Sequence, residues 1–278
     1  FKSMGIEDTG RLPRILAIGA HPDDCDIKAG GCAILWAKAG CAVRFVSTTN
    51  GDAGHHEMSG KELADRRKAE AEAAGRVAEI EYQVLDNRDG QLVPGLEQRW
   101  ELLRLIREFR PDLILTHRPN DYHPDHRYTS QLVQDCSYLI SVPNLCADTP
   151  CLETAPVMAY FWDEFNKPLP FKPDVAVDID SVLDTKMRML NCHASQFYEW
   201  LPWIDRHGIQ IPDDPSKRLD ALAEFVHGVT RPDDDARDLL KRYYGDGRGC
   251  GVINAETFEA CEYGAPLNGA AIRRLFPF

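Results

Sequence analysis

The chain has 278 residues, of which 44% are hydrophobic and 27% are charged. These proportions are ordinary for a globular protein with a sizeable core, and they argue against extensive disorder. The length leaves one large domain or two small ones, since a domain averages about 150 residues. The formal charge of -12, without a concentrated run of Lys and Arg, makes nucleic acid and anionic membranes poor candidates as partners.

The cysteines and the apolar runs bear on the compartment. Nine cysteines are scattered along the chain without a C-x-x-C pair, which argues against a disulfide framework and a thiolate zinc site. A reducing compartment fits this pattern, so we expect a cytoplasmic protein. Apolar runs such as residues 15–20 are far shorter than the roughly 18 residues of a membrane span. Phe1 to Ser3 lack the apolar stretch of a secretory signal and are left out of the fold prediction.

The first 116 residues alternate between strand and helix patterns. An apolar run from Arg14 to Ala20, closed by His21-Pro22, predicts a buried strand because both of its faces are apolar. Further strands are predicted at 43–48, 81–85 and 112–116. Helices are predicted between them at 29–39, 61–80 and 98–109. This alternation predicts βαβ units and therefore an α/β fold with a mostly parallel sheet flanked by helices.

The rest of the chain gives a weaker pattern. No G-x-G-x-x-G follows the first strand, which disfavours a dinucleotide site. Later strands are predicted at 157–161 and 174–178, and helices at 182–192, 216–228 and 233–243. The Gly-rich last 35 residues are predicted to be irregular. We therefore expect a catalytic domain over residues 1–200 and a less regular extension over 201–278, packed on the same domain. The extension could cap the site or build a subunit contact in a homo-oligomer.

Two polar clusters follow predicted strands. The first is His21-Pro22-Asp23-Asp24, and the second runs from Asp121 to His126. Parallel sheets bind ligands beyond the C-terminal ends of their strands, and a catalytic zinc takes three His or carboxylate ligands and a water. One His and one Asp from the first cluster and one His from the second would supply that set. The alternative is a turn with a helix N-cap and a solvated loop, but two such clusters in one sheet make coincidence a weak explanation.

The remaining groups of these clusters suit hydrolysis of an amide. Bound zinc lowers the pKa of its water to about 7. A carboxylate not tied to the metal must then take a proton, which suits the spare Asp of the Asp23-Asp24 pair. A second histidine could stabilise the oxyanion and protonate the leaving amine.

The sequences A-H-P-D-D at 20–24 and H-P-D-H at 123–126 resemble the paired signatures of the PIG-L/LmbE-like deacetylase family. The resemblance covers roughly residues 14–197 and extends to Arg67-x-x-Glu70, Asp89-Gly90, Arg110-Pro111-Asp112 and His193-Ala194-Ser195-Gln196. It implies a Rossmann-like α/β domain without a nucleotide role. It also implies removal of the N-acetyl group from an N-acetylglucosamine-type amino sugar or conjugate, a small-molecule substrate.

The same resemblance assigns roles to individual residues. It makes His21, Asp24 and His126 the metal ligands. It makes Asp23 the general base and His123 the residue that assists the tetrahedral intermediate and the leaving group. Sugar-hydroxyl contacts are implied for Arg67 and Asp89. We expect Zn2+, although the ligand types also suit Fe2+, Co2+ or Mn2+.

Several side chains keep two interpretations. Asp121 and His193 are candidates for substrate contact, and Asp121 and His117 could instead orient a ligand. Without the resemblance, Arg67 would be a charge on a solvated helix and Asp89-Gly90 a turn. His55-His56 is at most a lid on the substrate side.

Cys25 stands where the family often has Glu, and Asp26 follows it. Asp26 could replace the hydrogen bonds of that Glu, and Cys25 is predicted to be a buried, inert thiol rather than a ligand.

Two other functions are considered. One is a zinc-dependent amidohydrolase of another acyl amide, and the other is an inactive carbohydrate-binding relative. The presence of both Asp23 and His123 beside the three ligands argues against the inactive relative.

Overall fold

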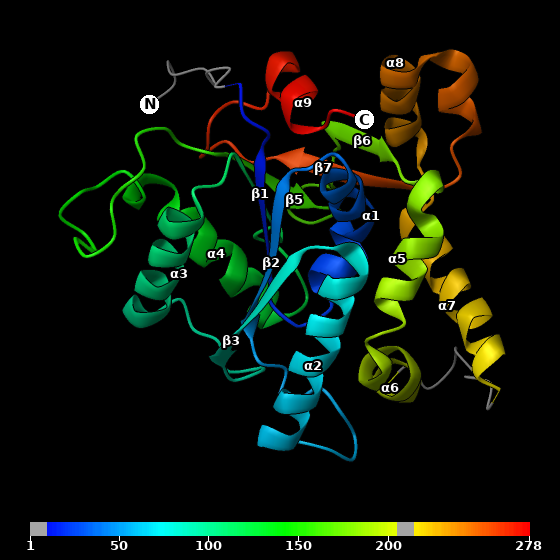
Figure 1. The fold of residues 1–278 in the computed structure, drawn as a ribbon, viewed down its shortest axis with the longest axis horizontal. Helices are drawn as coiled ribbons and strands as arrows, with labels where there is room; N and C mark the ends of the chain where they lie inside the picture. The colour runs from blue at the N-terminus through cyan, green and yellow to red at the C-terminus, as the bar shows by residue number, and fades with distance from the viewer. Residues whose placement is uncertain (1–9, 205–213) are drawn as a thin grey trace.

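A mixed sheet forms the centre of the molecule (Figure 1). The computed structural model describes residues 10–204 and 214–278, so Phe1 to Ser3 lie outside the described residues. Within these ranges the sheet has seven strands in the order β3-β2-β1-β4-β5-β7-β6. The strands are β1 (Arg14–Gly19), β2 (Ala42–Thr49), β3 (Glu81–Asn87), β4 (Leu113–Thr116), β5 (Val157–Phe161), β6 (Val175–Asp178) and β7 (Ala255–Ala260).

The strand order creates a switch point beside β1. The chain runs from β1 outward to β2 and β3 and then returns to β4 on the other side of β1. The pairs β1–β2, β2–β3, β1–β4 and β4–β5 are parallel, whereas β7 is antiparallel to β5 and β6. The predicted α/β fold with a mostly parallel sheet is therefore confirmed. Ligands bind such sheets at the C-terminal strand ends where the order reverses, which here is between β1 and β4.

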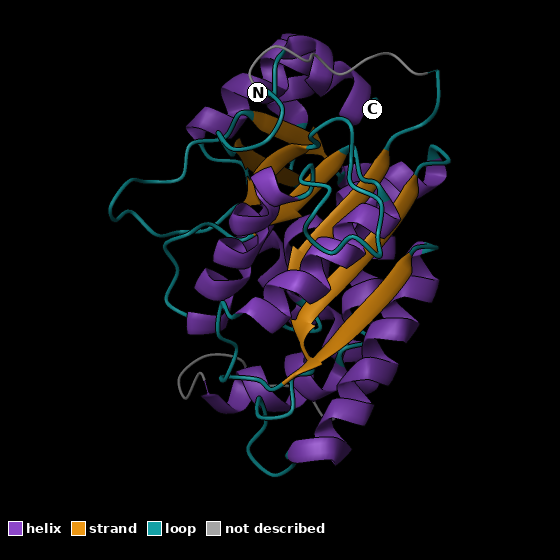
Figure 2. Ribbon diagram, turned by 90° about the vertical axis from the view of Figure 1, so that its left-hand side faces the viewer, coloured by secondary structure: helices purple, strands orange, loops and turns teal. Residues whose placement is uncertain are grey.

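Helices cover both faces of the sheet (Figure 2). Strand β1 shows why, since Ile15 and Ala17 join one buried cluster while Leu16 and Ile18 join another. The first cluster is covered by α1 (Asp24–Lys38), α2 (Gly60–Ala78), α5 (Leu183–Leu190) and α9 (Gly269–Leu275). The opposite face is covered by α3 (Leu96–Phe109) and α4 (Pro124–Leu139). No helix in the described ranges combines the length and the apolar character needed to cross a membrane.

The polar clusters lie at helix starts. Helix α1 begins at Asp24, five residues before the predicted start at Ala29. Helix α4 was not predicted, and it begins at Pro124 with His123 as its N-cap. Its polar first turn was interpreted as part of a cluster or as a loop, although Pro is favoured at the first helical position. Asp24 and His126 therefore lie in the first turns of helices rather than on loops.

The C-terminal region is more regular than predicted. The last 35 residues hold the end of α8 (Asp234–Gly251), the strand β7 and the helix α9, so the prediction of irregular structure there is wrong. The sequence of β7, Ala-Glu-Thr-Phe-Glu-Ala, carries two Glu and little strand propensity. Pairing with both β5 and β6 makes it a strand. The elements before it include three short ones, η1 (Asp180–Val182), the π-helix η2 (Ser195–Trp200) and α6 (Leu201–Ile204), and the longer helix α7 (Pro215–Thr230).

A buried ion pair between β7 and α5 also forms hydrogen bonds to α1. Glu256 of β7 accepts hydrogen bonds from the backbone N–H groups of Gly31 and Cys32, each at 2.7 Å. It also pairs with Lys186 of α5, which donates to the carbonyl of Ile27 at 2.7 Å. Both charged side chains are almost completely buried. The helix that carries Asp24 is thus fastened to a strand from the end of the chain.

Candidate active site

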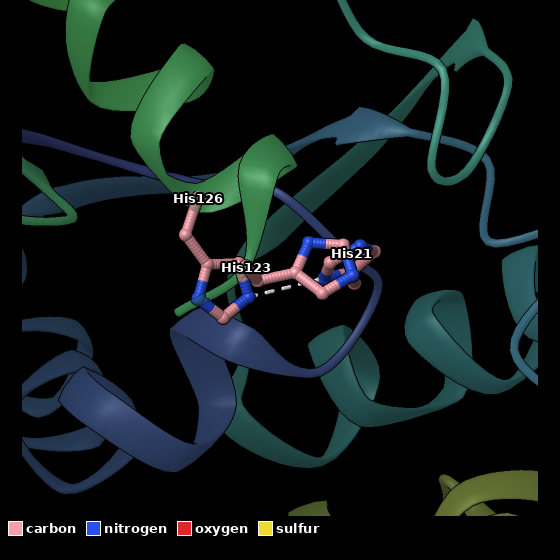
Figure 3. Close-up of side chains that lie close together, drawn as sticks. All are labelled: His21, His123 and His126. Atoms are coloured by element: carbon pink, nitrogen blue, oxygen red, sulfur yellow. Dashed lines mark hydrogen bonds between the residues drawn. The ribbon is translucent and has the colours of Figure 1, made fainter. Parts of the chain in front are cut away.

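The two polar clusters meet at the switch point of the sheet. His21 follows β1, and His123 and His126 stand at the start of α4, which follows β4. Figure 3 shows the three imidazoles side by side, with His123 and His126 projecting from one helix toward His21. Because β1 and β4 are parallel neighbours, the segments that leave their C-terminal ends lie together.

The spacing of three side chains fits a divalent metal. Nδ1 of His21 lies 3.2 Å from Nε2 of His126 and 3.4 Å from Oδ2 of Asp24. Nε2 of His126 lies 3.4 Å from Oδ1 of Asp24. Ligand atoms bound tetrahedrally at the usual zinc distances are about 3.4 Å apart. All three residues are buried, and the structure brings these predicted ligands together, with Oδ2 of Asp24 nearer His21 and Oδ1 nearer His126.

Carboxylates lie close to both of the histidines predicted as metal ligands. Nε2 of His21 lies 3.2 Å from Oδ1 of Asp89 and 3.4 Å from Oδ2 of Asp125. Nδ1 of His126 lies 3.0 Å from Oδ1 of Asp121. Such carboxylates fix the orientation and the tautomer of metal-ligating imidazoles. Asp89 and Asp121, predicted as substrate contacts, line the pocket and also lie beside these rings.

Sequence analysis did not single out Asp125, which is fully buried and also accepts a hydrogen bond from the N–H of Gly90 at 2.6 Å. It is the Asp of H-P-D-H. The general pairing of ligand histidines with carboxylates was the signal that could have identified it.

Asp24 is held firmly by its neighbours. Its Oδ2 accepts hydrogen bonds from the backbone N–H groups of Ala20 and His21 at 2.9 and 2.7 Å. His117 lies 3.2 Å from the same oxygen and stacks on His126 with 4.1 Å between ring centres. Burial, together with the charge of His126, lowers the pKa of His117 to about 4. His117 is therefore neutral near pH 7 and acts as a support for Asp24 and His126.

His123 is the alternative third ligand, because its ring lies with those of His21 and His126 in one group of ligand atoms within 4.8 Å. Its Nδ1, however, accepts a hydrogen bond from the N–H of Asp125 at 3.2 Å as the N-cap of α4. In a neutral ring this places the proton on Nε2. That tautomer favours a hydrogen-bond donor over a metal ligand.

Asp23 and Arg67 form a buried pair on the pocket wall. Oδ2 of Asp23 lies 3.3 Å from Nη2 of Arg67, and the two side chains are only 10% and 3% exposed. Burial raises the pKa of Asp23 to about 6, although the charge of Arg67 opposes this shift. Such a pKa suits a general base. Arg67 also donates to the carbonyls of Pro22 and Gly51, which excludes the alternative of a solvated helix face.

Three residues near the signature lie away from the pocket wall. His193 is fully buried, with Nε2 3.0 Å from Oδ1 of Asp26, and Asp26 accepts a hydrogen bond from the hydroxyl of Tyr82 at 2.7 Å. His193 therefore does not border the pocket, in contrast to its prediction as a substrate contact, because the turn before η2 places it beneath Asp26. Cys25 packs in the core and its burial raises the pKa of the thiol, as expected of an inert cysteine.

The site opens into a pocket of about 510 Å³. One wall carries the charged residues described above. The apolar lining of the pocket includes Ile27, Trp162, Phe165, Trp200, Phe225 and Val229, and Asp163 and Glu164 also border it. Ala53 and Gly54 border the pocket, whereas His55 and His56 stand outside it, with His55 bound to Glu199 at 2.8 Å.

Comparison with known proteins identifies the family. The sequence model of the PIG-L family, described as GlcNAc-PI de-N-acetylase, matches residues 16–137. A diacetylchitobiose deacetylase of Thermococcus kodakarensis is 30% identical over 233 residues, which cover 78% of this chain and 85% of the relative. A 4-oxalmesaconate hydratase of Pseudomonas putida is 27% identical over 195 residues, which cover 66% of this chain and 74% of the relative.

The fold is also that of a solved relative. The structure of N,N'-diacetylchitobiose deacetylase from Pyrococcus horikoshii, in complex with its inhibitor MPG, superposes with a TM-score of 0.67 at 24% identity. The match covers 91% of this chain and 85% of that chain, and it shows a shared fold. The family model spans both signatures and the diacetylchitobiose deacetylase is 30% identical over most of both chains, so this chain belongs to the PIG-L family.

Proposed function

We propose that this chain is a zinc-dependent deacetylase that removes the N-acetyl group from an N-acetylglucosamine-type amino sugar or its conjugate. The observation that carries the proposal is the grouping of His21, Asp24 and His126 at 3.2 to 3.4 Å from one another, beside Asp23 in one pocket. The diacetylchitobiose deacetylase relative supports the choice of an acetylated amino sugar.

His21, Asp24 and His126 would hold the metal. A bound divalent ion lowers the pKa of water toward neutrality and polarises an amide carbonyl. The carboxylates of Asp89, Asp125 and Asp121 keep the imidazoles of His21 and His126 oriented toward it.

Asp23 acts as the general base that takes the proton of the attacking water. Its burial and its contact with Arg67 hold the carboxylate on the pocket wall. His123 donates its Nε2 proton to the developing oxyanion or to the leaving amine, because its Nδ1 is occupied by the N–H of Asp125. Arg67 and Asp89 remain candidates for contact with sugar hydroxyls, since both line the pocket.

The test is zinc titration of metal-free protein, with release of acetate measured over a panel of N-acetylated sugars and glycosides. We expect activity to rise to a plateau at one zinc per chain in wild type and in His227→Ala, which removes a histidine outside this pocket. His21→Ala should show no plateau. Full activity in the metal-free protein would contradict the proposal.

The same preparations separate the competing activities. Hydration of 4-oxalmesaconate without release of acetate would place this chain with the hydratase relative instead. Release of another acyl group, with N-acetyl sugars unchanged, would keep the site and replace the substrate. Zinc binding without any turnover would indicate an inactive relative.

A further inference from the structure

Lys28 borders the pocket without a charged partner. It lies on α1 four residues after Asp24, and residues four apart share one face of a helix. Its Nζ lies 4.9 Å from the centre of the Trp162 ring. Within residues 10–204 and 214–278, Lys28 takes part in no hydrogen bond or ion pair, so this ring contact is its main interaction.

Lys28 is half-buried, and the fully buried cations of the described chain differ from it in their partners. Each of them meets carboxylate or carbonyl oxygens, namely Arg67, Arg107, Arg118 and Lys186. An ammonium group withdrawn from water costs free energy unless a partner replaces its hydration. Burial accordingly lowers the pKa of Lys28. A partner that enters through the pocket would remove this cost.

The carboxylates whose charges act on Lys28 are already engaged. These are Asp24, Asp121 and Asp163. Asp24 contacts His21 and His126, Asp121 lies 3.0 Å from His126, and Asp163 lies 2.9 Å from Arg118. The ammonium group of Lys28 is thus left for a ligand.

The surroundings of Lys28 would strengthen its pairing with an anion. Ile27, Trp162, Phe165 and Phe225 line the same pocket, together with the carboxylates of Asp163 and Glu164. Charge pairs in such surroundings are screened less than in water. The cation–π contact with Trp162 contributes only modestly and leaves the ammonium protons free to donate.

We propose that Lys28 binds an anionic group of the substrate, so that the enzyme prefers amino-sugar conjugates that carry a phosphate or a carboxylate. Lys28 lies one helical turn from Asp24, so the anions to test are those on the sugar positions next to the acetamido carbon, C1 and C3. This inference rests on the proposed deacetylase function and adds the charge of the substrate to it.

The experiment compares substrates that share the acetamido sugar and differ in charge. The neutral probe is the methyl glycoside of N-acetylglucosamine. The anionic probes are N-acetylglucosamine 1-phosphate, the carboxymethyl glycoside and N-acetylmuramic acid, which separate phosphate from carboxylate and C1 from C3. Each is assayed with zinc-loaded wild type, Lys28→Gln, Lys28→Arg and Lys38→Gln, the last of which removes an exposed charge at the end of the same helix.

In wild type, kcat/KM for at least one anionic probe should exceed that of the methyl glycoside by about 10- to 100-fold, the usual range for a charge-assisted hydrogen bond. Lys28→Gln should lose this preference while keeping its activity on the methyl glycoside within about twofold. Lys28→Arg should retain part of the preference, and Lys38→Gln all of it.

Two results would overturn the inference. One is a wild type that shows no preference for any anion. The other is a Lys28→Gln variant that loses activity equally on charged and neutral probes, which would assign Lys28 to the chemistry or to the fold. If no probe releases acetate, the deacetylase proposal fails separately. Calorimetric binding of N-acetylglucosamine 1-phosphate and the methyl glycoside to wild type and Lys28→Gln then decides whether Lys28 selects anions.

Discussion

Two parts of the chain, residues up to 126 and residues from 162 onward, contribute different kinds of side chain to one pocket. Residues up to 126 supply the charged wall, where the carboxylates and imidazoles contact one another. The later lining residues are mostly aromatic or aliphatic, including Trp162, Trp200 and Phe225, with Asp163 and Glu164 as the charged exceptions. We therefore expect substitutions at Asp23 and Asp24 to change turnover or metal binding, and substitutions at Trp162, Trp200 and Phe225 to change the affinity for the substrate.

The second half also supports the first. Glu256 and Lys186 hold the middle of α1, whose first residue is Asp24. The two regions therefore differ in the side chains that they contribute to the pocket, but the stability of the first depends on contacts with the second. Substitutions on each side should change different observables, and the following variants test that separation.

The largest expected effect is on turnover in the first half. Asp23→Asn should retain metal and lower kcat by about 100- to 10,000-fold, because the amide keeps the shape of the side chain but cannot accept the proton. Asp24→Asn is the matched control, since it should lose metal affinity instead. Zinc content and release of acetate must be measured on the same preparations. Near-normal turnover of zinc-loaded Asp23→Asn would place the base elsewhere, with His123 to be tested next.

The next effect is on stability and arises in the second half. Glu256→Gln should lower the free energy of unfolding by about 3 to 5 kcal/mol, because it leaves the buried ammonium group of Lys186 uncompensated. Urea unfolding of the metal-free protein, followed by circular dichroism, measures this change without the contribution of metal binding.

Asp148→Asn is the control for a lost charge pair. Asp148 pairs with Arg104 on the surface, with side chains 61% and 40% exposed, so its loss should cost at most about 1 kcal/mol. Equal effects of Glu256→Gln and Asp148→Asn would show that the pair between β7 and α5 does not support α1.

The contrast between the halves also explains what could be predicted from the sequence. The first half alternates apolar strands with amphipathic helices. The succession of strands and helices along the chain therefore follows from the pattern, and the convergence of His21 and His126 follows from the pattern together with the family signatures. Strand β7 could not be predicted, because its two Glu residues give a weak strand pattern and its pairing partners lie about 80 to 100 residues away. The position of His193 beneath Asp26 likewise depends on packing that local periodicity does not encode.

A smaller effect is expected from the carboxylates behind the ligands. Asp121→Asn should weaken zinc affinity by about 10- to 100-fold, since an amide orients the ring of His126 less well than a carboxylate does. Competition with a chelator of known affinity measures this change. Asp135→Asn alters a partly exposed residue on α4, the helix that carries His126, and this variant should bind zinc like wild type. Unchanged affinity in Asp121→Asn would leave Asp121 as a substrate contact only.

The smallest expected effect concerns the apolar wall. Trp200 lines the pocket and stacks on Trp203 with 5.3 Å between ring centres. Aromatic contacts of this kind contribute about 0.5 to 1.5 kcal/mol, so Trp200→Ala should raise KM for glycosides with an apolar aglycone by about 2- to 10-fold. Its kcat and zinc content should stay within about twofold of wild type, because the metal ligands and Asp23 lie on the other wall. Tyr263→Ala removes an exposed aromatic ring that does not border this pocket, and it should leave both constants unchanged. A fall in kcat of Trp200→Ala as large as that of Asp23→Asn would show that the second half takes part in the chemistry, and the division between the two walls would then be wrong.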